Sequence, residues 1–149
     1  MQSSLGKEQV NIYSMSSHQF LDHTADMTMR VQSADKKSLF IQGALGLMEL
    51  VFGDLSKEVS IVEHEELELS ATDRDMLFAD WLSELHVRAV LHGVMVRDLR
   101  INYLSDDHIE ATLYYGRATP TREIKAVTLH NLHLMHTDHQ WQVDVTFDL

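Results

Sequence analysis

The sequence contains no cysteine among its 149 residues, which excludes disulfide bonds, zinc–thiolate sites and a thiol nucleophile. It contains a single proline, and 44% of its residues are hydrophobic. That composition is typical of one globular domain rather than of a disordered chain. Because free thiols and disulfides are both missing, the sequence fits a reducing compartment, and we expect a cytoplasmic protein.

Basic residues are also scarce. The chain has 12 lysines and arginines against 23 acidic residues, which gives a formal net charge of −11 with histidine neutral. A protein that binds phosphate backbones needs a basic patch, and no run of lysine or arginine supplies one. We therefore expect no strong direct binding of nucleic acid. Glycine-rich phosphate loops, G-x-S-x-G elbows and H-E-x-x-H motifs are missing as well, which disfavours the common enzyme classes.

The first 17 residues lack the continuous apolar core of a secretory signal. No stretch of the sequence looks long and apolar enough to cross a membrane, so we expect no membrane contact. Residues 1–17 are polar and irregular, and Met15 is an alternative start. We predict a flexible N-terminal extension over residues 1–17 and a single domain over residues 18–149.

Apolar and polar residues alternate along residues 20–31, which predicts one strand with Asp22 and Asp26 on its polar face. Further strands are predicted from the same period of two at 59–69, 95–103, 109–115 and 141–147. Residues 124–135 are apolar on both faces, which predicts a central strand.

Two helices are predicted from apolar residues at helical spacing. The first begins at Asp35 and ends at Gly53. The second follows the capping sequence at 72–75 and runs to about His92, with Gly93 as its stop. Together the elements predict an α+β domain in which two helices pack on a largely antiparallel sheet.

Carboxylates supply the first candidate site. Asp22 and Asp26 on one face would point into water, pair with cations or bind a hard metal, and a solvated strand face is the simpler interpretation. At the other end of the sequence, Asp148 stands next to the terminal carboxyl group of Leu149. These groups form half of an oxygen-ligand site, unless the chain end simply frays.

A lone cation and a series of histidines are the remaining candidates. Lys125 lies in the most apolar segment, with its ammonium either in water or next to carboxylates. His130, His133, His136 and His139 recur at a spacing of three, which on a strand divides them between two faces and disfavours a shared metal. Five other histidines offer no better site: His18, His64, His86, His92 and His108.

Four segments of the sequence resemble the archease family, in the family's order and over residues 19–149. They are F-L-D-H-T-A-D, M-L-F-A-D-W-L-S-E-L, I-K-A-V-T-L-H-N-L and V-D-V-T-F-D-L. Two departures are small. The sequence has Leu129-His130-Asn131 where the family often has Tyr-His-Gly, and Leu149 where the family often ends in isoleucine.

The resemblance implies a small cytoplasmic protein that activates an RtcB-type RNA ligase and has no catalysis of its own. Archeases promote the GTP-dependent guanylylation and multiple turnover of that ligase in tRNA splicing and RNA repair. The implied fold is an α+β arrangement with a strand-helix-strand-strand core.

The family's metal site matches Asp26, Asp148 and Leu149, and its functional lysine matches Lys125. The metal implied is a divalent ion, with Ca²⁺ expected in a structure and Mg²⁺ or Mn²⁺ as alternatives. Three further residues are candidates for supporting the metal ligands without binding the ion themselves: Asp22, His23 and His130.

Two functions of other classes remain open. One is a free-standing metal-dependent enzyme that acts on a small molecule, for which Asp22, His23 and Asp26 are the compact candidates. The other is a general chaperone-like protein whose acidic surface binds basic clients.

Overall fold

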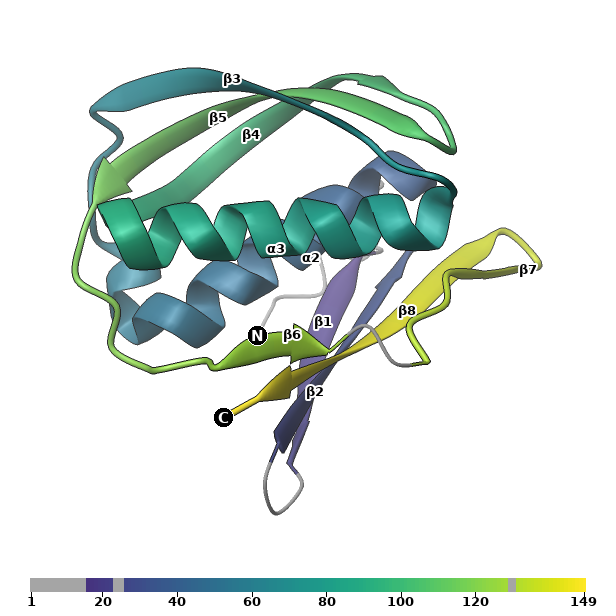
Figure 1. Ribbon diagram of the computed structural model, residues 1–149, viewed down its shortest axis with the longest axis horizontal. Helices are drawn as coiled ribbons and strands as arrows, with labels where there is room; N and C mark the ends of the chain where they lie inside the picture. Colours follow the sequence, from purple (N-terminus) through teal and green to yellow (C-terminus); the bar gives the residue numbers. More distant parts are fainter. Residues whose placement is uncertain (1–15, 23–25, 129–130) are drawn as a thin grey trace, which may run out of the picture.

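The computed structural model describes residues 16–22, 26–128 and 131–149. Two helices, α2 (Lys36–Phe52) and α3 (Arg74–His92), form a layer between two antiparallel sheets (Figure 1). The strands are β1 (Ser17–Asp22), β2 (Asp26–Ser33), β3 (Glu63–Ser70), β4 (Val94–Leu104), β5 (His108–Arg117), β6 (Ala126–Thr128), β7 (Met135–Thr137) and β8 (Gln140–Asp148). One sheet has the order β1-β2-β8-β6, with β7 also paired to β8, and the other has the order β3-β5-β4. The α+β class is confirmed, but the helices separate two sheets where the sequence suggested one.

Helix α2 is the centre of the core. Its N-cap is Asp35, whose side chain accepts a hydrogen bond of 2.7 Å from the backbone N–H of Ser38, and it ends at Gly53, as predicted. Together with the short 3-10 helix η1 (Gly53–Lys57), it is long and apolar enough to span a membrane by length and composition, contrary to the sequence prediction. Most of it is buried against both sheets, as expected for the core helix of a globular domain.

Helix α3 is held by caps at both ends. Asp73 is its N-cap, one residue after the threonine of the predicted capping box, and accepts a hydrogen bond from the backbone N–H of Met76. Gly93 ends the helix at a φ of 64°, a left-handed conformation that glycine adopts without a steric penalty. The predicted buried stripe is confirmed at Leu77, Trp81, Leu85 and Ala89.

His86 on α3 has a ring nitrogen, Nε2, that is buried and has no hydrogen-bond partner within the described ranges. Burial lowers the pKa of His86 below its ordinary value. At His86 the unfolded chain therefore binds a proton at a higher pH than the folded chain does. As the pH falls through about 6.5 towards the folded-state pKa, protonation of His86 in the unfolded chain lowers the free energy of unfolding.

We therefore expect His86→Phe to reduce the loss of unfolding free energy between pH 7.5 and pH 5.5. Urea unfolding at both pH values measures this loss. The matched control is His92→Gln, because His92 is exposed on the same helix. An equal loss in the wild-type protein and in His86→Phe would show that His86 does not contribute.

The predicted strand over 20–31 is wrong. Instead, β1 and β2 form an antiparallel pair in which Asp22 lies opposite Met27. Asp22 and Asp26 therefore belong to different strands and do not share the polar face of one strand. Apolar and polar residues alternate in both strands without a change of pattern between them. The sequence pattern therefore gave no sign that the chain reverses direction there.

The predicted central strand over 124–135 is also wrong. Only β6 and β7, with three residues each, are strands in the described part of this segment, and β6 lies at the edge of its sheet. Ile124 and Leu134 are buried although they lie outside these strands, while Met135 is exposed. The apolar composition of this segment thus reflects side chains inserted into the core from irregular backbone.

Two smaller predictions also need correction. The strand expected over 59–69 begins only at Glu63. Tyr103 was expected on the buried face of its strand, but it is 51% exposed because a register shift between Ile101 and Tyr103 interrupts the alternation.

Of the predicted N-terminal extension, residues 1–15 lie outside the described residues, and Ser17 pairs with Gln32 as the first residue of β1.

Candidate functional site

The polar face shared by β2 and β8 is a row of cross-strand pairs. Thr28 lies opposite Thr146 with their hydroxyl oxygens 3.3 Å apart, and Gln32 donates a 2.8 Å hydrogen bond to Gln142. Arg30 forms two hydrogen bonds with Asp144, of 2.9 and 3.0 Å. These hydrogen bonds and the negative charge of Asp144 raise the pKa of Arg30. Three of the four polar pairs are therefore chemically complementary.

The fourth pair, Asp26 opposite Asp148, is not complementary. Two carboxylates directly across a strand pair repel each other, and such pairs destabilise a sheet. Asp26 is half-buried, and its Oδ1 atom is shielded from solvent without a hydrogen-bond partner among the residues that the structure describes. A buried carboxylate oxygen with no donor is costly, so this end of the row is suited to a cation.

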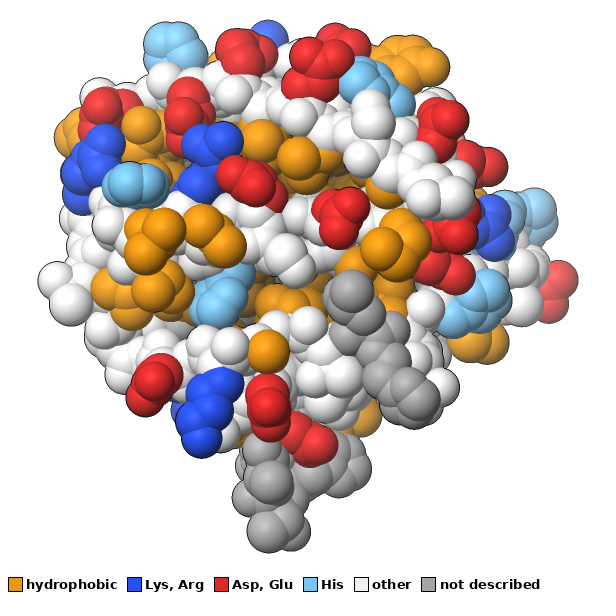
Figure 2. All heavy atoms as spheres, in the orientation of Figure 1, with side chains coloured by type: hydrophobic (Ala, Val, Ile, Leu, Met, Phe, Trp, Pro, Cys, Tyr) orange, Lys and Arg blue, Asp and Glu red, His pale blue; other side chains and the backbone are white. Residues whose placement is uncertain are grey.

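Lys125 reaches the same place from the other side of β8. Lys125 immediately precedes β6, whose first residue, Ala126, pairs with Asp148. The backbone N–H of Lys125 donates a 2.8 Å hydrogen bond to the carbonyl oxygen of Asp148. Residues 26, 125 and 148 thus come from three neighbouring strand ends. Figure 2 shows acidic side chains beside a basic one in this region, close to the carboxyl terminus marked in Figure 1.

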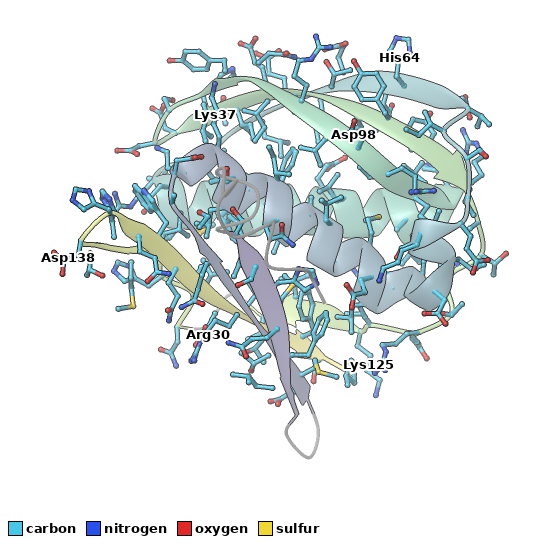
Figure 3. All side chains as sticks on the ribbon, turned by 180° about the vertical axis from the view of Figure 1, so that it is seen from behind. Arg30, Lys37, His64, Asp98, Lys125 and Asp138 are labelled. Carbon is cyan, nitrogen blue, oxygen red and sulfur yellow. The ribbon has the colours of Figure 1, made fainter. Side chains whose placement is uncertain are left out.

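The side chain of Lys125 is exposed and lies at the outer margin of the fold (Figure 3). Within residues 16–22, 26–128 and 131–149, no carboxylate lies within 4.0 Å of its ammonium group. The sequence left open whether this lysine neutralises the two aspartates or stays in water. In the structure its backbone supports Asp148, and its charge is available to a ligand.

Residues 18–149 match the model of one protein family, described as the Archease protein family (MTH1598/TM1083). The chain belongs to the archease family. Among its relatives, Protein archease of Methanopyrus kandleri is 29% identical over 139 residues, which cover 87% of this chain and 96% of the relative. Protein archease of Methanosarcina barkeri is 26% identical over 141 residues, covering 89% and 95% of the two chains.

Two solved structures share the fold of this archease. The solution structure of Methanobacterium thermoautotrophicum protein 1598 superposes with a TM-score of 0.70 and 25% identity, over 89% of this chain and 98% of that one. The crystal structure of a Thermotoga maritima archease, described as a possible chaperone, gives a TM-score of 0.59 at 19% identity, over 87% and 94% of the two chains. The second likeness supports the fold alone.

The C-terminal residue of this archease is anchored rather than frayed. Leu149 is half-buried, and its side chain packs against the core. Its terminal carboxyl group is therefore held next to Asp148, at the end of the row of polar pairs. Together with the two aspartates, it gives the site a set of oxygen donors, which is the chemistry that Ca²⁺, Mg²⁺ and Mn²⁺ accept.

The three residues expected to support the metal ligands are only partly described by the structure. Asp22 pairs through its backbone with Met27, one step along β2 from Asp26. The side chain of Asp22, together with His23 and His130, lies outside the described residues.

The histidines spaced by three make separate contacts where they are described. His133 lies 2.9 Å from a carboxylate oxygen of Asp75, and His136 stacks on the ring of Trp141 at a centroid distance of 4.2 Å. His139 lies in the turn between β7 and β8. The three described histidines of the series therefore have different surroundings.

The ion pair of Arg30 and Asp144 was not predicted from the sequence. It shows that a polar position of this row can be neutralised by its cross-strand partner, unlike Asp26. The two residues are separated by more than 100 positions, and only the register of β2 on β8 brings them together. An alternation of polar residues on both strands was visible in the sequence, but it does not identify partners.

Proposed function

We propose that this archease is a cytoplasmic activator of an RtcB-type RNA ligase. It promotes the ligase's GTP-dependent guanylylation and multiple turnover in tRNA splicing and RNA repair, without catalysis of its own. The observation that carries the proposal is the uncompensated pair of Asp26 and Asp148, with the buried, partnerless Oδ1 atom of Asp26.

In this proposal Asp26, Asp148 and the carboxyl group of Leu149 hold a divalent cation. The residues fit such an ion because all three offer oxygen ligands and because two of them repel each other without one. A bound divalent ion supplies positive charge that neutralises phosphate oxygens. The chain's own part is to hold these oxygens at the end of a sheet, where a partner can approach them.

Lys125 contributes a second, independent positive charge. Its ammonium is exposed and forms no ion pair with the described carboxylates, so it is free to contact a phosphate of GTP or an acidic group of the ligase. The acidic character of the whole molecule favours approach to a basic ligase active site rather than competition for RNA.

The test is a ligase guanylylation assay with and without this archease. We expect Asp26→Asn and Asp148→Asn each to reduce the stimulation about tenfold or more, since even supporting residues of a metal site contribute tenfold to a hundredfold. Lys125→Ala is expected to reduce it by a similar factor, because a hydrogen bond from a charged group contributes roughly 1.5 to 3 kcal/mol.

Asp138→Asn is the matched control, because Asp138 is an exposed aspartate in the turn between β7 and β8, away from the site (Figure 3). Unchanged stimulation by all three folded site variants would contradict the proposal. The Thermotoga maritima relative is described as a possible chaperone. A chaperone-like role for this chain predicts equal help for unrelated basic clients, whereas the proposal predicts stimulation of the ligase at a low molar ratio.

A further inference from the structure

Three potential metal ligands converge on the sheet formed by β3, β5 and β4, away from the aspartate pair. Glu68 on β3 lies directly opposite Glu110 on β5, and His108 is two residues from Glu110 on the same strand. The neighbours Leu67 and Ile109 are buried, so Glu68, His108 and Glu110 lie on the outer face of the sheet. The Nε2 atom of His108 is 3.1 Å from a carboxylate oxygen of each glutamate.

The ring of His108 is held in this orientation by its other nitrogen. Nδ1 lies 2.7 Å from the hydroxyl oxygen of Ser70, the residue opposite His108 in the register of β3 and β5. The ring of Tyr103 packs against the imidazole at a centroid distance of 5.8 Å. A hydrogen bond to the distal nitrogen is the usual way in which proteins orient a metal-binding histidine.

A positive charge would stabilise this cluster. In the tautomer with the proton on Nδ1, His108 donates a hydrogen bond to the hydroxyl oxygen of Ser70. Its Nε2 atom then directs a lone pair towards the two carboxylates, so three electron-pair donors converge on one point. No lysine or arginine in the described part of the chain forms an ion pair with Glu68 or Glu110. A metal ion bound at this point would supply the positive charge that no lysine or arginine supplies there.

The distances fit a metal ion. The three candidate ligand atoms lie within 4.8 Å of one another. A tetrahedral ion with bonds of about 2.0 to 2.2 Å places neighbouring ligand atoms roughly 3.3 to 3.6 Å apart. The two observed separations from Nε2 are 3.1 Å, so small side-chain adjustments are enough to admit an ion.

We propose that Glu68, His108 and Glu110 form a second divalent-metal site, specific for Zn²⁺ and related transition metals. The imidazole ligand distinguishes it from the all-oxygen aspartate site, which suits Ca²⁺ or Mg²⁺. Three protein ligands leave a fourth position open to water or to a ligand atom of a partner. The ion joins the edge strand β3 to β5 and removes the repulsion between Glu68 and Glu110. This proposal does not depend on ligase activation.

The test is calorimetric titration of the full chain with Zn²⁺, together with the visible absorption spectrum of the Co²⁺-loaded protein. We expect His108→Ala and Glu68→Gln to weaken Zn²⁺ binding by well over tenfold and to abolish the tetrahedral Co²⁺ spectrum. Ser70→Ala is expected to weaken binding about tenfold through the orientation of His108. Two controls, His136→Ala and Asp138→Asn, are expected to leave the Co²⁺ spectrum unchanged.

Backbone amide NMR of the wild-type protein gives an independent readout, because paramagnetic Co²⁺ shifts the resonances nearest to it. We expect the largest shifts at residues of β3 and β5 around Glu68 and His108. Unchanged Zn²⁺ affinity in folded His108→Ala, or the largest shifts at His136 or Asp26, would overturn the proposal. If His108→Ala fails to fold, Glu68→Gln and the NMR map still decide the question, because Glu68 is an exposed side chain on an edge strand.

Discussion

Calcium or magnesium is expected to stabilise the wild-type protein and to leave the Asp26→Asn variant unchanged. An ion that binds only the folded state, present at 100 times its dissociation constant, adds about 2.7 kcal/mol to the unfolding free energy. The variant lacks the half-buried carboxylate whose Oδ1 atom has no partner in the described structure. Urea unfolding with Ca²⁺ and with a chelator measures the difference.

Without metal, the same substitution is expected to have the opposite effect on stability. Asp26→Asn removes one member of a like-charged pair, so the metal-free variant should be as stable as the wild type or more stable by up to about 1 kcal/mol. Asp144→Asn is the matched control on the same face, because it breaks the ion pair with Arg30 and is expected to lose roughly 0.2 to 1 kcal/mol. A metal-free Asp26→Asn that is clearly less stable than the wild type would show that Asp26 has a structural partner instead.

Trp81→Ala is expected to have the largest effect on stability of any change considered. Trp81 is fully buried, its indole N–H donates a 2.9 Å hydrogen bond to the carbonyl oxygen of Phe40, and its ring packs near that of Phe40. Large-to-small substitutions of buried aromatic residues cost about 3 to 5 kcal/mol. Because small domains are stable by about 5 to 15 kcal/mol in total, the variant is expected to lose a large share of its stability.

Two substitutions test the cause of this effect. Trp81→Phe retains most of the apolar contact but leaves the carbonyl oxygen of Phe40 without the indole donor, so it is expected to cost less than Trp81→Ala. Val90→Ala changes an exposed residue of the same helix and is expected to stay within about 0.5 kcal/mol of the wild type. Denaturant unfolding measures all three, and a loss below 1 kcal/mol for Trp81→Ala would contradict the packing described for α2 and α3.

The helices could be predicted from the sequence because their signals are local. Asp35 and Gly53 mark the ends of α2, and the buried stripe of α3 follows from residues three or four positions apart. Strand pairing depends on contacts between distant residues. Neither the hairpin of β1 and β2 nor the irregular backbone around Ile124 leaves a distinct local pattern, and the division into two sheets follows from pairings that no single segment specifies.

The difference between local signals and contacts of distant residues also explains what could be predicted about the two candidate sites. The sequence pattern singled out Asp26, Lys125 and Asp148 as separate candidates, and a family resemblance joined them into one site. The structure brings their backbones together. The cluster around His108 was not identified, because Glu68 is 40 residues away and meets it only through the register of β3 on β5. The H-I-E sequence at 108–110, with two ligand types on one face of a strand, was the available signal.

The position of β8 has a consequence for the order of folding. This strand is the last in the sequence, yet it lies inside its sheet and pairs with β2, β6 and β7. During synthesis, β2 is made more than 100 residues before β8. The edge of β2 that pairs with β8 therefore stays without hydrogen-bond partners from that strand until β8 has been made. The pair of Asp26 and Asp148 can therefore form only after β8 has been made and has paired with β2. An ion held by both aspartates would therefore bind only after these two strands, far apart in the sequence, have joined as the central pair of this sheet.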